Sequence, residues 1–235
     1  MKTLLILAGS LCATTYAGAQ EIAPVKTTFE DMEVVLNQAG FESYAYDLSS
    51  FLEGDTRYDV AIRIKEYDGG KELDNDRVFH LGPTRMLLND IPEEYRAEIP
   101  DSVMLDSERG ILRESGRLVL GRYPSGVDSV ARWVFHLENG SRGSSRIDLK
   151  AVVTSGNSPF YGYESRPFVK SGFESGKFIP LIFFGSMWYD AQYGIFRFCG
   201  ESEIDPDLTT GMIVKQVPHF YVLGVEFTAK QGATE

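Results

Sequence analysis

Apolar and polar residues alternate with a period of two along much of the chain. In YDVAIRIKEY, Val60, Ile62 and Ile64 fall on one face, and Arg63 and Lys65 fall on the other. This pattern predicts a strand that is buried on one side. The turn signal DGGK follows, and RVFHL at 77–81 is the expected return strand.

Three later runs predict an antiparallel meander. They are GRLVLGRY at 116–123, VARWVFHL at 130–137 and RIDLKAVV at 146–153, separated by segments rich in Gly, Ser and Pro. In the middle run Trp133, Phe135 and Leu137 share one face. We expect that face to point into the core.

The C-terminal third is more apolar. The unbroken run from Phe178 to Phe184 is typical of a strand covered on both faces, and Pro180 then marks its beginning, an edge position or a bulge. The last run, HFYVLGVEF, alternates cleanly and predicts a strand inside a sheet. Only TFEDMEVVLNQAG and IPEEYRAEIPDS indicate helices, both short.

These elements predict an all-β fold. Several strands with Gly-rich turns favour an antiparallel β-sandwich, jelly-roll or immunoglobulin-like, with one or two short helices; a partly open barrel is the alternative. The chain shows no internal repeat and no long linker, so we expect residues 20–235 to form a single domain.

The first 19 residues indicate export. Lys2 precedes a short apolar run and the small residues Ala17, Gly18 and Ala19, which is the organisation of a secretory signal peptide. The apolar run is far shorter than the roughly 20 residues that cross a bilayer, so we expect no transmembrane span. The signal peptide implies a periplasmic, surface or extracellular location.

Charge and cysteine content bear on the partners of the protein and on disulfide bonding. The net charge of −11 disfavours nucleic acid as a partner, because phosphate backbones are repelled. Of the two cysteines, Cys12 lies in the signal region, and Cys199 follows the apolar pattern GIFRF. A lone thiol forms no intramolecular disulfide, and we expect Cys199 to be buried as a small apolar residue.

Two aromatic clusters are the candidate ligand-binding residues. The first, in GNSPFYGYESRPF, contributes Phe160, Tyr161 and Tyr163 from a segment too rich in Gly and Pro for a regular strand. The second, in SMWYDAQYGIF, contributes Trp188 and Tyr189. Sugars stack on aromatic rings, so exposed rings here favour a glycan ligand; the alternative is that they pin a loop to the core. We hypothesise that the two clusters form one surface.

Catalytic signatures are absent from the sequence. It contains no G-x-S-x-G, H-E-x-x-H, Walker or C-x-x-C motif, and its three histidines lie far apart. Two carboxylates placed across a sugar would suffice for a glycosidase, but 34 acidic residues always offer some pair. A carboxylate-dependent hydrolase is therefore the weakest of our hypotheses.

Two acidic loops are candidate Ca²⁺ sites. KELDNDR supplies Asp74 and Asp76, and ESEIDPDLTT supplies Asp205 and Asp207. Ca²⁺ binds roughly six to eight oxygens, which such loops provide, although neither has the EF-hand spacing. Solvated turns are the alternative. We expect no other cofactor.

The signal peptide, the YDVAIRIKEYDGG strand and the closing PHFYVLGVEF resemble a family of small secreted β-proteins of unknown function from Bacteroides-type bacteria. The resemblance implies no activity and no site residues. Asp101-Ser102-Val103 and Asp128-Ser129-Val130 are similar to the tripeptide that such bacteria O-glycosylate. Ser102 and Ser129 are therefore candidate sugar acceptors.

Taken together, these features favour a non-enzymatic binding or accessory domain for a glycan or another cell-envelope component. A structural or assembly protein that contacts an envelope partner is the alternative, because the edges of a sandwich lend themselves to strand addition. The sequence leaves the oligomeric state open.

Overall fold

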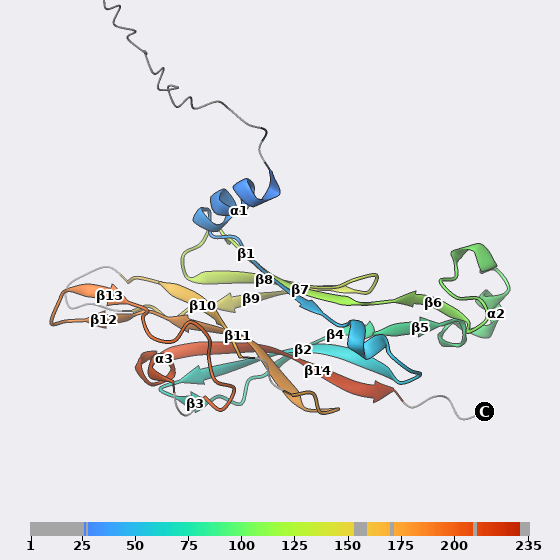
Figure 1. Cartoon of the computed structure of the whole chain (residues 1–235). Coiled ribbons are helices and arrows are strands. Elements are labelled where there is room, and N and C mark those ends of the chain that lie inside the picture. The colour runs from blue at the N-terminus through green and yellow to red at the C-terminus, as the bar shows by residue number, and fades with distance from the viewer. Residues whose placement is uncertain (1–25, 27, 153–158, 170–171, 209–210, 231–235) are drawn as a thin grey trace, which may run out of the picture.

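The protein is described by a computed structural model, which places residues 26, 28–152, 159–169, 172–208 and 211–230. The signal segment lies outside these described residues. Two antiparallel sheets pack face to face (Figure 1). The prediction of an all-β sandwich is confirmed.

The smaller sheet has four strands in the order β1-β7-β8-β9. Their bounds are Glu42–Asp47, Arg117–Tyr123, Val130–Leu137 and Arg142–Asp148. Strands β7, β8 and β9 are consecutive antiparallel neighbours, which confirms the predicted meander. Strand β1 pairs with β7 and forms one edge of this sheet.

The larger sheet has six strands. Its order is β10-β11-β14-β2-β3, with β4 also paired to β2. The bounds are Tyr163–Pro167 for β10, Phe178–Ser186 for β11, His219–Lys230 for β14, Arg57–Asp68 for β2, Lys71–Glu72 for β3 and Arg77–Pro83 for β4. The predicted return strand is β4, and β14 lies inside the sheet between β11 and β2, as expected.

The main core fills the space between the two sheets. Trp133, Phe135 and Leu137 of β8 have no exposed surface, and Ile62 and Ile64 of β2 are equally buried on the opposite sheet. These are the faces that alternation predicted. Each such side chain contributes roughly 1.5–3 kcal/mol through removal from water, so the two alternating patterns together fix how the sheets face each other.

A second core covers the outer face of the larger sheet. Phe183 of β11 and Phe220 of β14 point outward and pack against Ile213 and Val217, which belong to the short helix α3 (Met212–Gln216) and the residue after it. Strand β11 is therefore buried on both faces, which accounts for its unbroken apolar run. The pairing of β11 with β14 shifts register between Pro180 and Ile182, so the proline marks a bulge.

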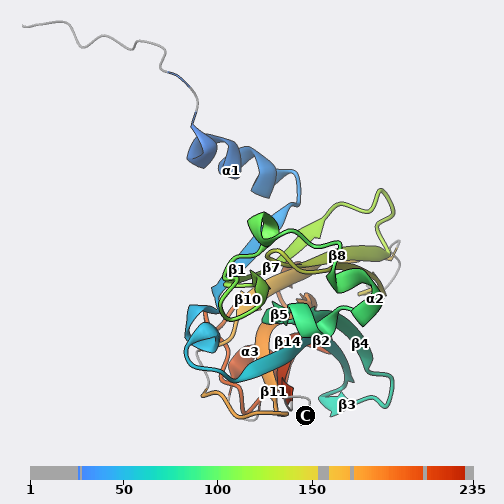
Figure 2. The ribbon, with the colours of Figure 1, turned by 90° about the vertical axis from the view of Figure 1, so that its right-hand side faces the viewer.

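Three segments extend beyond the sandwich. Helix α1 (Phe29–Gln38) stands outside the two sheets (Figure 2). The paired strands β5 (Arg85–Leu87) and β6 (Ile111–Glu114) form an arm with helix α2 (Glu93–Arg96) at its far end, and a hairpin of β12 (Trp188–Asp190) and β13 (Ile195–Arg197) projects at the opposite end (Figure 1). Both predicted helical segments contain helices.

The prediction that Cys199 is buried is wrong. Strand β13 ends at Arg197, and the chain turns at Gly200, where φ is +141°. Phe198 packs against the second core, so the next side chain, Cys199, points to solvent and is exposed.

The described residues include no helix that is long and apolar enough to cross a membrane.

Candidate functional site

The hairpin of β12 and β13 presents aromatic rings at one end of the molecule. Tyr189 lies opposite Phe196 in the register of the two strands, and an Arg197–Asp190 ion pair of 2.7 Å joins them. The guanidinium of Arg197 also lies 5.0 Å from the centre of the Tyr193 ring. These contacts hold a small two-stranded element in one conformation.

The two predicted aromatic clusters meet at this hairpin. The ring centre of Phe160 lies 4.2 Å from that of Phe196, which in turn lies 5.4 Å from that of Tyr189. We call the resulting surface the aromatic tip; it consists of Phe160, Tyr189, Tyr193, Ile195 and Phe196. Tyr193 is 62% exposed and Phe160 38% exposed. Phe160 thus joins the second cluster, as hypothesised, but Tyr161 and Tyr163 of the first cluster do not belong to this surface.

Trp188 differs from the other predicted rings. It begins β12, but it is half-buried and packs against the second core under the hairpin. Its main contribution is to attach the hairpin to the larger sheet.

Tyr161 faces a shallow groove of about 360 Å³. We call it the Tyr161 groove. The turn between β7 and β8 forms one wall with Tyr123, Ser125 and Asp128, and Leu149 lies opposite. The groove therefore joins one tyrosine-bearing loop to a polar turn, and its volume falls within the usual range for small-molecule sites.

Arg122 also lines the Tyr161 groove and has two fixed contacts. Its guanidinium pairs with Glu42 of β1 and lies 5.5 Å from the centre of the Phe184 ring. Glu42 also accepts a hydrogen bond of 2.5 Å from the Ser165 hydroxyl. Burial, and then the negative charge of Glu42, raise the pKa of Tyr44 to about 12, so that hydroxyl stays protonated beside the pair. Arg122 is thus fixed in place, with its charge paired to Glu42.

Tyr163 is not an exposed platform, which corrects our prediction for this residue. It begins β10, and its ring is 6% exposed. The backbone N–H of Lys150 donates a 3.0 Å hydrogen bond to the Tyr163 hydroxyl. That hydroxyl donates in turn to Nδ1 of His219 at 2.6 Å. Burial is the main reason that the pKa of Tyr163 is raised. The ring reaches the groove only as part of its wall.

His219 is a buried residue that sequence reasoning did not single out. Its Nε2–H group donates to Glu66 at 2.9 Å, and Asn75 donates to the other oxygen of Glu66 at 2.6 Å. Burial lowers the pKa of His219, although Glu66 acts in the opposite direction. The alternation of β14 places His219 on the same face as Tyr221 and was the signal that could have shown it to be buried.

The Tyr163, His219 and Glu66 side chains resemble the members of a catalytic relay, but their setting is structural. The Tyr163 hydroxyl donates a hydrogen bond to His219 and accepts one from a backbone amide. The Tyr163 side chain is almost fully buried. A nucleophile must meet a substrate atom, which this burial prevents. The three groups instead tie β10, β14 and β2 together.

The acidic loops do not converge on a metal site. Asp76 pairs with Arg63 at 3.1 Å, and a carboxylate oxygen of Asp205 accepts from the backbone of Asp207 at 2.9 Å, as in a solvated turn. Asp74 is exposed. Across the described parts of the chain, no group of three or more His, Cys, Asp or Glu side chains is arranged to hold a metal ion. Calcium binding stays a prediction.

The candidate sugar acceptors lie in different settings. Ser102 is exposed in a 3₁₀ helix at the far end of the arm, whereas Ser129 is half-buried in the turn that precedes β8. Their modification stays a prediction.

A comparison with protein families places the chain in one of them. A family model described as "Domain of unknown function (DUF5041)" matches residues 11–229. No curated protein and no solved structure matches the chain. The resemblance to an uncharacterised domain family is thereby confirmed, and the protein belongs to the DUF5041 family of domains of unknown function.

Proposed function

We propose that the protein is an exported, non-enzymatic binding domain whose ligand is a glycan of the cell envelope, bound in the Tyr161 groove beside the aromatic tip. The observation that supports this proposal is that the loop before β10 contributes neighbouring rings to both the aromatic tip and the Tyr161 groove. Phe160 packs on the hairpin, and its neighbour Tyr161 lines the groove.

The chemistry of the groove suits a saccharide. Sugar rings have apolar C–H faces that stack on aromatic side chains, and hydroxyl groups that exchange hydrogen bonds with polar residues. Tyr123 and Tyr161 supply rings, whereas Ser125 and Asp128 supply polar atoms. Arg122 also lines the groove, where its charge is already paired with Glu42.

The preformed structure of the site also favours binding. Arg122 is fixed by Glu42 and Phe184, and the hairpin by its ion pair, so little side-chain freedom is lost when a ligand binds. Export agrees with the N-terminal sequence, which has the organisation of a signal peptide.

A glycan-array screen tests this function. We expect the wild-type domain to bind one class of glycan, and the change Tyr161→Ala to weaken that binding about tenfold or more, because a stacked ring is lost. The matched control is Tyr95→Ala, which removes a 56% exposed ring on α2 at the opposite end of the molecule. Equal binding by both variants, or none by the wild type, contradicts the proposal.

A specific observation favours a second function, that of an assembly protein. Phe29, Met32, Val34 and Val35 of α1 are each more than half exposed on a helix that stands outside the sandwich. An apolar helical surface of this kind is typical of a contact with another chain. A mass in solution that corresponds to a multimer, and that Phe29→Ser reduces to one chain, supports this alternative over the first.

A further inference from the structure

A small cavity lined by arginines lies where the arm of β5 and β6 leaves the sandwich. Its volume is about 140 Å³, and Arg57, Arg85 and Arg109 line it together with Asp55, Leu87 and Ile111. We call it the arginine cavity. The arm lies at the opposite end of the molecule from the β12–β13 hairpin (Figure 1), so a ligand bound in the arginine cavity is separate from a glycan in the Tyr161 groove.

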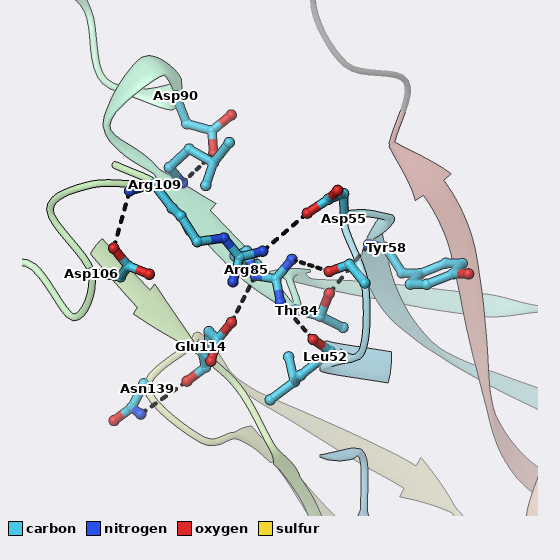
Figure 3. A network of polar contacts seen from close by, with 12 residues as sticks. Leu52, Asp55, Tyr58, Thr84, Arg85, Asp90, Asp106, Arg109, Glu114 and Asn139 are labelled. Carbon is cyan, nitrogen blue, oxygen red and sulfur yellow. Dashed lines mark hydrogen bonds and ion pairs between the residues drawn. The ribbon is translucent and has the colours of Figure 1, made fainter. Parts of the chain in front are cut away.

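Arg85 is the most firmly held of the three arginines. It is 3% exposed. Its Nε–H donates to Glu114 at 2.7 Å, and its two Nη atoms donate to the backbone carbonyls of Gly54 and Leu52 at 2.9 and 2.6 Å (Figure 3). Each Nη nitrogen bears two hydrogens, so the guanidinium keeps donors beyond those that fix it.

Arg57 is also buried, with 9% of its surface exposed. Its Nη1 atom donates to both carboxylate oxygens of Asp90, at 3.0 and 2.8 Å. Within the described part of the chain, its Nε and Nη2 groups have no hydrogen-bond partner, and neither atom is sealed from solvent. Arg57 therefore keeps donors that no hydrogen bond of the described residues uses, and it lines the cavity.

Arg109 lies at the rim of the cavity and forms a weak ion pair with Asp55. Its Nη2 atom lies 3.0 Å from Asp55, but the two side chains are 49% and 97% exposed. An ion pair so exposed stabilises a fold by about 0–1 kcal/mol, so Asp55 is readily replaced by another anion. Figure 3 shows Arg109 extending toward Asp55.

Each arginine of the cavity is paired with a carboxylate. Lys230 also contacts Asp90, at 3.3 Å, so one carboxylate is shared between Lys230 and Arg57. Four cations lie beside four carboxylates, because Asp55 and Asp106 on the rim add to Asp90 and Glu114, and Asp106 accepts from the backbone N–H of Arg109. The charges are therefore balanced, and an anion that enters the cavity takes the place of Asp55 beside Arg109.

We propose that the arginine cavity binds a small oxyanion, with phosphate or sulfate as the preferred group. Guanidinium groups match the oxygens of such anions with paired N–H donors. A water occupies roughly 30 Å³ of liquid, so the cavity has room for about four or five waters. That space suits a single oxyanion and is too small for a drug-sized molecule.

Calorimetry and thermal melts with inorganic phosphate, sulfate and acetate at constant ionic strength test the proposal. We expect phosphate or sulfate to bind the wild-type protein at a single site and to raise its melting temperature. Acetate tests whether a carboxylate suffices. Arg109→Ala should weaken binding about tenfold or more, because it removes a charged donor from the rim while the buried arginines stay in place.

The matched control is Arg146→Ala. Arg146 is 67% exposed and pairs with Asp148 at 3.3 Å on β9, so the change removes a similar surface ion pair outside the cavity. The proposal requires Arg146→Ala to bind like the wild type. It is overturned if none of the three anions binds at millimolar concentration, if Arg109→Ala binds as tightly as the wild type, or if both variants lose binding equally.

Discussion

At the scale of residues, the chain of hydrogen bonds around His219 governs how stability responds to pH. Burial lowers the pKa of His219 below its ordinary value of 6.5, and the histidine accepts from Tyr163 through Nδ1, which only the neutral ring allows. The unfolded chain is protonated first as pH falls. The stability contributed by His219 is therefore fully present above pH 6.5 and is lost as pH falls below that value.

Urea denaturation of the wild type and of His219→Gln checks this expectation. Between about pH 7.5 and about pH 5.5, the free energy of unfolding of the wild type should fall more steeply than that of the variant. The control is His136→Gln, which changes a half-buried histidine on β8 that lies outside the Tyr163–His219–Glu66 chain of hydrogen bonds. A His219→Gln variant with the same slope as the wild type would show that His219 is not the group responsible.

The sequence showed which aromatic residues to consider, but it did not show which of their side chains point to solvent and which point into the core. The aromatic clusters were identified from composition, yet Tyr163 points inward whereas Tyr161 lines the groove. Strand β10 is five residues long and follows Gly162, so alternation offers too few positions to fix which face is buried. Cys199 failed for a similar reason, since β13 ends two residues before it.

At the scale of elements, burial separates the central strands from the projecting hairpin. Leu223 of β14 lies in the main core with no exposed surface, whereas Ile195 of β13 is 46% exposed. Leu223→Ala should lower the free energy of unfolding by about 2–5 kcal/mol, because it leaves a cavity between the sheets. Ile195→Ala should change it by less than about 0.5 kcal/mol.

Chemical denaturation of both variants measures this contrast. A large loss for Ile195→Ala would mean that the hairpin is part of the cooperative core, and the description of the aromatic tip as a free surface would then be wrong. A small loss for Leu223→Ala would contradict the position of β14 at the centre of the larger sheet.

Strands could be predicted where apolar and polar residues alternate with a period of two over several residues. Strands β2, β7, β8 and β14 satisfy this condition. The buried faces of β2 and β8 agree with the prediction, and β14 lies inside a sheet as expected, although it is buried on both faces. The arm of β5 and β6 was not foreseen, because its strands have only three and four residues. Its anchor is Arg85, a buried charge that no hydrophobic pattern indicates.

At the scale of the whole molecule, the sandwich separates two surfaces of different chemistry. One end bears exposed rings and a groove with a single fixed arginine, and the other bears a cavity lined by three arginines. The fold class could be predicted from the sequence because it depends on many strands at once. The pairing of Phe160 with Phe196 could only be hypothesised, since the two residues are 36 positions apart and nothing local specifies their contact.

Amide hydrogen exchange of the domain, with and without the glycan selected by the array, tests the central claim most directly. A ligand in the Tyr161 groove should slow exchange at 122–128 and 130–131 and at Tyr161 and Tyr163, which line the groove, and leave the arm at 85–114 unchanged. Slower exchange confined to α1 or to the arm, with no change around Tyr161, would contradict the account and move the binding surface elsewhere.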